Sequence, residues 1–508
     1  MAMAATHILR GATAHADSPA IYVGDDTLTF QQVNDRANLI AHHLLAAGVQ
    51  KGAHVALLVN NGLNSVPMDF AAIKTGVVRV PLNARLSLDE HAAMVEGSRA
   101  SVVVADASLI ERATELAGRI DGLQILGLGA QAEGIADLLE PADGPIGEPD
   151  VELSPDDPTL LLYTSGTTGK LKAVIHTQGS YGAICTNILA NLLDPRHDSV
   201  MLHAASLIHA SGTFVLPYWV RGGASAILPG FEPASFAAAI ARYRVTEINL
   251  VPTMFAMLLS TGVLADADLS SLRKVIYGAS PMPAPVLERS IEAFGPILAQ
   301  YYGQTEAPLV IAALDEQAHA DRSLWGACGM PSTDVELTLL DDDGREVPRG
   351  EIGEITLRAP FQMAGYFDAD ELNAATFTPD GWIKTRDLAR FDERGYLHLV
   401  DRTSDMIITG GYNVYPREVE DALASHPGVA ECAVVGAPDE KWVEAVTAFV
   451  VVAPGAQVSE SELIEHVRGL IAAHKAPKTV HLVEAIPKSA VGKILRRALR
   501  EPLWEASK

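Results

Sequence analysis

Cysteine is scarce in this 508-residue sequence, which contains three, at positions 185, 328 and 432. Their number is odd and they lie far apart, so they supply neither the close spacing of a thiolate metal site nor a disulfide framework. We therefore expect a protein of a reducing compartment, in which Cys185, Cys328 and Cys432 are small core residues and not nucleophiles.

Long apolar runs are lacking too. The longest, such as Gly76–Leu82, fall well short of the roughly 18 residues that a membrane-spanning helix needs. The N-terminal segment MAMAATHILRGATAHADSPA contains no extended apolar stretch of the kind found in secretory signals. These absences predict a soluble, cytoplasmic protein.

Positive charge is in short supply, since 38 lysine and arginine residues face 63 aspartate and glutamate residues, for a net charge of −25. A strongly negative surface repels nucleic acids and anionic membranes, so we exclude both as general partners. Any anionic ligand must be held by local groups instead. The chain length predicts about three domain-sized units, or one large body and a smaller one, and a hydrophobic fraction of 48% supplies a large core.

Strand-like and helix-like segments alternate along the first part of the chain. Short apolar runs rich in β-branched residues are separated by helical stretches such as Phe30–Ala47 and Leu109–Ile120. This alternation is typical of parallel sheets covered by helices. From Asp334 onward, two alternating segments around an acidic, glycine-containing turn predict a β-hairpin, and a domain boundary is expected near Asp401–Ser404.

A polar loop between two short apolar segments is the first sign of a binding site. In LLYTSGTTGKLKAVIHT (161–177), the segment Thr164–Gly169 consists of threonine, serine and glycine, and Lys170 and Lys172 follow it. Such a loop offers hydroxyl and backbone N–H donors to an anion, with a lysine as the counter-charge. Taken alone, it fits a phosphate site and a polar hairpin turn equally well.

Three downstream segments favour the phosphate site: AQYYGQTEAP (299–308), GWIKTRDLARFDERGYLHLVDRTSDMIITGGYNVYPREVE (381–420) and PKSAVGKILRR (487–497). Together with the loop, and in this order, they resemble the adenylate-forming (ANL) superfamily, and within it the AMP-forming acyl-CoA synthetases. The resemblance covers nearly the whole chain. It implies a large α/β N-terminal domain (1–402) with two doubly wound sheets and a β-barrel-like subdomain. A small, mobile α+β C-terminal domain (403–508) would carry the catalytic lysine.

The resemblance implies a reaction in two steps. ATP would activate a carboxylic acid to an acyl-adenylate with release of pyrophosphate, and coenzyme A would then take the acyl group with release of AMP. Lys493 would bridge the carboxylate and the α-phosphate, Thr305 would lie beside that phosphate, and Glu306 would coordinate Mg²⁺. These three residues are the predicted catalytic set.

The resemblance also places residues around ATP and AMP. Asp387 would accept hydrogen bonds from the ribose hydroxyls with Arg402 as support, and Tyr302 would lie against the adenine. The full nucleotide set is Thr164, Ser165, Gly166, Thr167, Thr168, Gly169, Lys172, Gly278, Ala279, Ser280, Tyr302, Gly303, Asp387 and Arg402. Two segments depart from the family pattern: Leu171-Lys172-Ala173 replaces Pro-Lys-Gly, and Arg386 replaces a glycine. Arg386 adds a phosphate contact or points to solvent.

The same resemblance implies which residues bind coenzyme A and the carboxylic acid substrate. Ser404 would be the hinge residue, and Gly410, Gly411, Trp442 and Lys478 would bind coenzyme A. The predicted walls of the acyl pocket are His209, Asn249, Ala279, Tyr301, Gly303, Pro308 and Leu309. They include no arginine, which argues against a dicarboxylate and favours an aromatic or cinnamate-type acid, or a short- to medium-chain fatty acid. The alternatives are a stand-alone enzyme that loads a carrier protein, and a catalytically silent nucleotide-binding protein. The oligomeric state is left open, with a homodimer as the commonest arrangement for a soluble enzyme.

Overall fold

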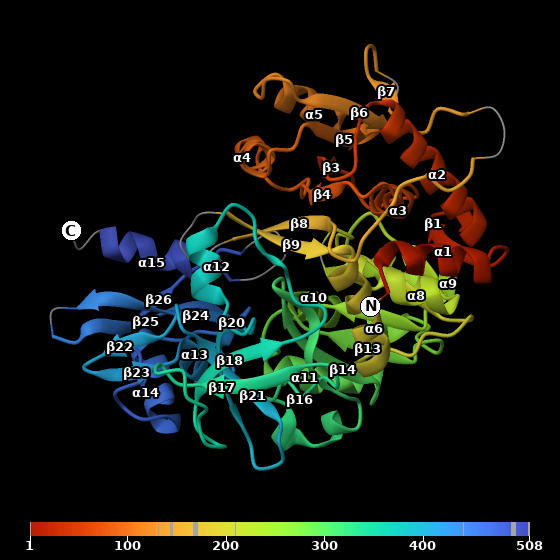
Figure 1. Ribbon diagram of the computed structural model, residues 1–508. Coiled ribbons are helices and arrows are strands. Elements are labelled where there is room, and N and C mark those ends of the chain that lie inside the picture. The colour runs from red at the N-terminus through yellow and green to blue at the C-terminus, as the bar shows by residue number, and fades with distance from the viewer. Residues whose placement is uncertain are drawn as a thin grey trace.

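The computed structural model describes residues 2–130, 132–142, 146–165, 171–208, 210–439, 441–488 and 494–505. Two large sheets, a smaller antiparallel sheet and a C-terminal lobe make up the molecule (Figure 1). All three cysteines are buried and unpaired, as predicted. None of the described helices combines the length and hydropathy that a bilayer crossing requires.

The first large sheet has eight strands, parallel in its centre and antiparallel where β8 and β9 pair. In spatial order the strands are β19 (Gly365–Tyr366), β9 (Leu171–Thr177), β8 (Pro158–Ser165), β4 (Val78–Pro81), β3 (His54–Leu58), β5 (Val102–Asp106), β6 (Gln124–Leu128) and β7 (Ala136–Asp137). The apolar runs with no polar alternation become these central strands because both faces are covered.

The second large sheet has nine strands, parallel from β14 through β1 and antiparallel at both edges. In spatial order they are β16 (Met330–Pro331), β15 (Ala307–Leu314), β14 (Leu298–Gln304), β13 (Lys274–Tyr277), β12 (Glu247–Leu250), β10 (Val200–His203), β11 (Ala224–Ile227), β1 (Pro19–Val23) and β2 (Asp26–Thr29). The predicted pair of sheets is thus confirmed, with mixed edges.

A layer of helices lies between the two sheets, and one apolar cluster joins its side chains to both of them. The layer consists of α1 (Ala4–Ala14), α2 (Phe30–Ala46), α3 (Ser65–Thr75), α6 (Gln178–Asn191), α7 (Ala210–Thr213) and α8 (Val215–Arg221). The outer faces are covered by α4 (Leu88–Ser98) and α5 (Ile110–Ala117) on the first sheet, and by α9 (Pro233–Tyr243), α10 (Pro252–Thr261) and α11 (Ala284–Phe294) on the second.

The hairpin predicted after Asp334 belongs to a four-stranded antiparallel sheet, and the prediction of a barrel-like subdomain is wrong. The sheet runs β17 (Glu336–Leu340), β18 (Gly353–Arg358), β20 (Ile383–Phe391) and β21 (Leu397–Arg402), and α12 (Asp370–Thr376) precedes β20. Its two edge strands, β17 and β21, are not paired with each other. Four strands are too few to close around a filled interior, so the sheet stays open.

The C-terminal lobe has its own sheet and its own apolar core. Its elements are β22 (Ile407–Thr409), β23 (Tyr412–Val414), α13 (Pro416–Ala424), β24 (Val429–Asp439), β25 (Val443–Val452), α14 (Glu460–Leu470), β26 (Thr479–Leu482) and α15 (Arg496–Glu505). The expected boundary after Arg402 coincides with the end of β21. The division at that residue and the mobility of the lobe stay predictions.

Candidate active site

The polar loop predicted to hold phosphate joins β8 to β9. These strands form an antiparallel hairpin in which Thr164 is the cross-strand partner of Lys172. Gly166, Thr167, Thr168 and Gly169, with Lys170, lie outside the described residues, as does the side chain of Ser165. The described part of the hairpin therefore fixes where the loop begins and ends.

Lys172 shares its surroundings with Glu306, Arg386 and Tyr366. Its ammonium nitrogen lies 5.6 Å from the centre of the Tyr366 ring. Burial lowers the pKa of Lys172, and the positive charge of Arg386 acts in the same direction, while Glu306 opposes it. Arg386 has a φ of 63°, in the left-handed region that favours the glycine of the family pattern. Two cations thus lie near the single carboxylate of Glu306.

Tyr366 is a site residue that the sequence analysis missed. Its hydroxyl donates a 2.6 Å hydrogen bond to Oε1 of Glu306. It reaches this position because β19 pairs with β9, which places Tyr366 opposite Val174. Burial and the negative charge of Glu306 both raise the pKa of Tyr366. The tyrosine therefore remains a neutral donor that fixes the orientation of the carboxylate.

His176, on β9, is a second residue that was missed. Its Nε2 lies 2.8 Å from the carbonyl oxygen of Thr305, which makes Nε2–H the donor. Burial lowers the pKa of His176 to about 4, so the imidazole is neutral at physiological pH. The bond ties the Thr305–Glu306 turn to β9, the strand that also carries Lys172.

Asp387, Arg402 and Tyr302 lie together. Asp387 and Arg402 are cross-strand partners on β20 and β21, and Nε of Arg402 lies 3.1 Å from Oδ1 of Asp387. The hydroxyl of Tyr302 donates a 2.6 Å hydrogen bond to Oδ2 of the same carboxylate. The negative charge of Asp387 raises the pKa of Arg402. The sequence placed Tyr302 against adenine; its hydroxyl additionally positions Asp387.

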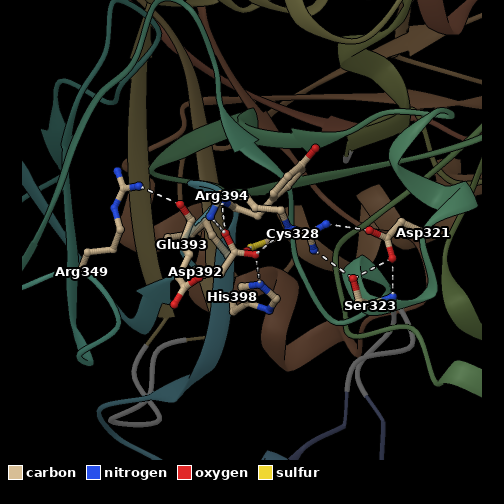
Figure 2. A network of polar contacts seen from close by, with 10 residues as sticks. Asp321, Ser323, Cys328, Arg349, Asp392, Glu393, Arg394 and His398 are labelled. Carbon is tan, nitrogen blue, oxygen red and sulfur yellow. Dashed lines mark hydrogen bonds and ion pairs between the residues drawn. The ribbon is translucent and has the colours of Figure 1, made fainter.

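The far end of the β20–β21 hairpin is anchored by a polar network (Figure 2). Arg394, in the turn, donates hydrogen bonds of 2.7 Å to Asp321 and 2.9 Å to Ser323. Arg349 donates to the carbonyl oxygen of Glu393 at 3.2 Å. These contacts hold the tip of the hairpin against the large domain, so they stabilise the strands that carry the ribose-binding candidates at the opposite end.

Glycine at two predicted positions is required by close backbone approach. A Cβ at Gly278 would lie 2.5 Å from the carbonyl oxygen of Tyr301, and one at Gly303 would lie 2.3 Å from that of Leu309. Ala279 has a φ of 70°, and the segment 278–280 follows directly after β13. The segment 278–280 thus lies against β14, next to the strand end that leads into the Thr305–Glu306 turn.

A cavity of about 180 Å³ opens beside Thr305. Of the predicted acyl walls, Ala279, Tyr301, Gly303, Pro308 and Leu309 line it. Its remaining walls come largely from α3, α6 and α8, whose lining side chains include Val66, Met68, Phe70, Ile73, Ile184, Val215 and Leu216. No spacing in the sequence links these helices to residues 301–309, because the contacts arise only when the two sheets pack on one helical layer.

Two of the acyl-pocket predictions need correction and one is not described. Asn249 is not among the lining residues and instead accepts a 3.2 Å hydrogen bond from the hydroxyl of Tyr301. The expected absence of arginine is wrong, because Arg79 lines the cavity. His209 lies outside the described residues, although its neighbours Ile208 and Ala210 line the wall.

The residues predicted to bind coenzyme A gather on one edge of the C-terminal lobe. The ammonium groups of Lys441 and Lys478 lie 4.7 Å and 5.7 Å from the centre of the Trp442 ring. The N–H of Gly410 donates to the carbonyl oxygen of Trp442 at 2.8 Å, and a Cβ at Gly410 would lie 2.8 Å from the ring. Gly411, next to it, has a φ of 84°, and open space lies where a Cβ would stand.

Two predicted residues remain to be placed. Ser404 follows β21 by two positions, and its hydroxyl lies 3.1 Å from Oδ1 of Asp405. Lys493 lies outside the described residues.

Comparison with known proteins gives matches along nearly the whole chain. A family model described as AMP-binding enzyme matches residues 9–367, and one described as AMP-binding enzyme C-terminal domain matches residues 418–493. The medium/long-chain-fatty-acid–CoA ligase FadD8 of Mycobacterium tuberculosis (strain ATCC 25618 / H37Rv) is 38% identical, over 99% of this chain and 90% of its own. A feruloyl-CoA synthase of Amycolatopsis sp. is 37% identical, over 97% of both chains. The solved structure of the amide bond synthetase McbA from Marinactinospora thermotolerans is similar with a TM-score of 0.90 and 31% identity, over 98% of this chain and 99% of that one.

Proposed function

This chain belongs to the AMP-binding enzyme family, and from that premise we propose that it is an AMP-forming acyl-CoA ligase. It activates a carboxylic acid with ATP to an acyl-adenylate and then transfers the acyl group to coenzyme A. The observation that carries the proposal is the meeting of Lys172 and the Asp387–Arg402 pair near Glu306, whose neighbour Thr305 lines a largely apolar cavity. Lys172 and Arg402 supply locally the positive charge that anionic substrates need and that the negatively charged surface does not offer.

The first step brings a carboxylate and a triphosphate together, so it needs positive charge and oriented donors. Lys172 holds the terminal phosphates, and Asp387 accepts from the ribose hydroxyls. Glu306 fits Mg²⁺, which uses one or two protein carboxylates and enters with the nucleotide. No group of three or more His, Cys, Asp or Glu residues able to enclose a metal occurs in the described part of the chain. Bound Mg²⁺ would neutralise phosphate charge, and Tyr366 orients the carboxylate that holds it.

The acid is an aromatic or cinnamate-type acid or a short- to medium-chain fatty acid. The aliphatic and aromatic side chains of the cavity bind such groups by burial. One relative is named as a fatty-acid ligase and another as a feruloyl-CoA synthase, so the names of the relatives include both a fatty acid and a cinnamate-type acid. The proposal is tested by pyrophosphate release from ATP and Mg²⁺ across benzoates, cinnamates, fatty acids and dicarboxylates, each with and without coenzyme A. Turnover that depends on coenzyme A supports it, and a single burst would instead indicate a carrier-protein acceptor.

Replacing Trp442 by alanine is expected to raise the KM for coenzyme A by about tenfold, because a base stacked on the ring loses that contact. The adjacent Lys441 and Lys478 would hold the phosphates of coenzyme A. ATP–pyrophosphate exchange, which reports only the first step, should not change. The matched control is Trp382→Ala, which removes another tryptophan with a cation over its ring, in this case Arg358. An equal effect of both variants on KM would contradict the assignment.

A cytoplasmic location and a homodimer stay predictions of the sequence.

A further inference from the structure

The wall of the acyl cavity contains a buried arginine. Arg79 lies on β4 and lines the cavity, yet only 2% of the residue is exposed. Its strand neighbours Val78 and Val80 belong to the apolar cluster on the other face of the sheet. Because side chains alternate along a strand, Arg79 alone of these three faces the helical layer that encloses the cavity.

Three contacts hold the guanidinium, and one nitrogen is left over. Nε donates a 2.9 Å hydrogen bond to the carbonyl oxygen of Thr159, and Nη1 forms an ion pair with Asp69 of α3. The guanidinium carbon lies 4.6 Å from the centre of the Tyr181 ring. The Tyr181 hydroxyl also interacts with the guanidinium, but Nη2 is buried and makes no hydrogen bond of ordinary geometry with the described residues. A charged donor without an acceptor is unfavourable in an apolar environment, so a ligand that brings an acceptor is favoured there.

The chemistry of that acceptor follows from Asp69. The Asp69 side chain is 37% exposed and lines the same cavity, so part of its carboxylate remains open to a ligand. A hydroxyl group accepts from Nη2 of Arg79 and donates to Asp69, which satisfies both partners. If the substrate carried a second carboxylate at this end, it would lie beside the carboxylate of Asp69 in a largely apolar space, where like charges repel strongly.

We propose that the acid substrate carries an uncharged hydroxyl group away from its carboxylate, and that the Arg79–Asp69 pair recognises this hydroxyl. The inference rests on the ligase function proposed above. Thr305, which is predicted to lie at the reaction centre, and Arg79 line one cavity, so both face the space that the acid would occupy. Arg79 and Asp69 are thus specificity residues, which bind the substrate remote from the reacting atoms.

The test measures kcat/KM for AMP formation with coenzyme A, using the full-length protein and matched acids. The acids are p-hydroxycinnamate, cinnamate and p-carboxycinnamate, and ω-hydroxyoctanoate with octanoate. We expect the hydroxylated member of at least one series to be favoured by about tenfold or more over the unsubstituted acid. The dicarboxylate should be the poorest of its series.

A double variant, Asp69→Asn with Arg79→Met, removes the ion pair without leaving one charge buried alone. It should lose the preference for the hydroxyl, so that the ratio of kcat/KM for the hydroxylated acid to that for the unsubstituted acid falls to about one. The matched control is Asp89→Asn with Arg119→Met, which removes an exposed ion pair in the same N-terminal part of the chain and should keep the preference for the hydroxyl. If thermal unfolding shows that the double variant does not fold, Arg79→Lys keeps the charge, lacks Nη2 and should likewise lose the preference.

The outcomes separate the two proposals. No preference for hydroxylated acids in the wild-type protein, or a preference that survives in the double variant, overturns the role of Arg79 while the ligase function stands. No AMP formation with any acid overturns the ligase function and this inference together.

Discussion

Replacing Lys493 by alanine is expected to slow formation of the acyl-adenylate by about 100- to 1000-fold, the cost of losing one preorganised donor to a developing negative charge. Lys493 is the second lysine of PKSAVGK, and its family position bridges the carboxylate and the α-phosphate. Transfer of the acyl group from a synthetic adenylate to coenzyme A should stay close to the wild-type rate, because the mobile C-terminal lobe is expected to turn Lys493 away from the phosphate before that step. ATP–pyrophosphate exchange and the transfer assay measure the two steps separately.

Lys488→Ala provides the matched control for this prediction. Lys488 is the first lysine of the same motif and forms a 2.8 Å ion pair with Glu431. On the other side of Lys493, Arg496 is held by Glu420 at 2.6 Å and by Asp405 at 3.4 Å. Loss of Lys488 should therefore leave adenylate formation nearly unchanged. Equal losses in both variants would mean that the lysines act through the folding of the C-terminal lobe and not through the reaction.

The layered part of the fold could be predicted from the sequence because it depends on local patterns. The helix expected over Phe30–Ala47 is α2, which begins at Phe30 because Thr29 and Gln32 form a capping box. The stretch expected over Leu109–Ile120 contains the shorter α5, preceded by a turn of 3₁₀ helix. That the β17–β21 sheet stays open could not be predicted, since each strand pattern is the same in an open sheet and in a barrel.

The residues of the candidate site likewise fall into those that the sequence could identify and those that it could not. Lys172, Glu306, Asp387 and Arg402 stand in motifs whose order along the chain could be recognised, and the described structure brings Asp387 and Arg402 into register. Tyr366 could not be found, because β19 has only two residues and its partner β9 lies nearly two hundred positions away. Arg79 was hidden for a related reason: within the run VVRVP it has no local signal, and the cavity that it lines exists only after α3 packs on the sheet.

Replacing Asp387 by alanine is expected to lower kcat/KM for ATP by about 100-fold or more, mainly through KM. Two hydrogen bonds from ribose hydroxyls to a carboxylate are worth about 1.5–3 kcal/mol each, and each 1.4 kcal/mol is a factor of ten. The carboxylate is 6% exposed and is held by Arg402 and Tyr302, so its removal also leaves both partners without an acceptor.

Two variants separate the ribose contact from this structural effect. Tyr302→Phe removes one hydrogen bond to Asp387 and keeps the charge, so we expect a loss in kcat/KM for ATP of about tenfold at most. Arg394→Ala loosens the anchored tip of the same hairpin without touching Asp387, and should lower the melting temperature more than it changes KM. If Arg394→Ala raised the KM for ATP as much as Asp387→Ala, the carboxylate would be acting through the stability of the hairpin. A KM effect confined to Asp387→Ala and, more weakly, Tyr302→Phe requires that the carboxylate meet the nucleotide directly, because only these two changes alter the charge or the hydrogen bonding at that point.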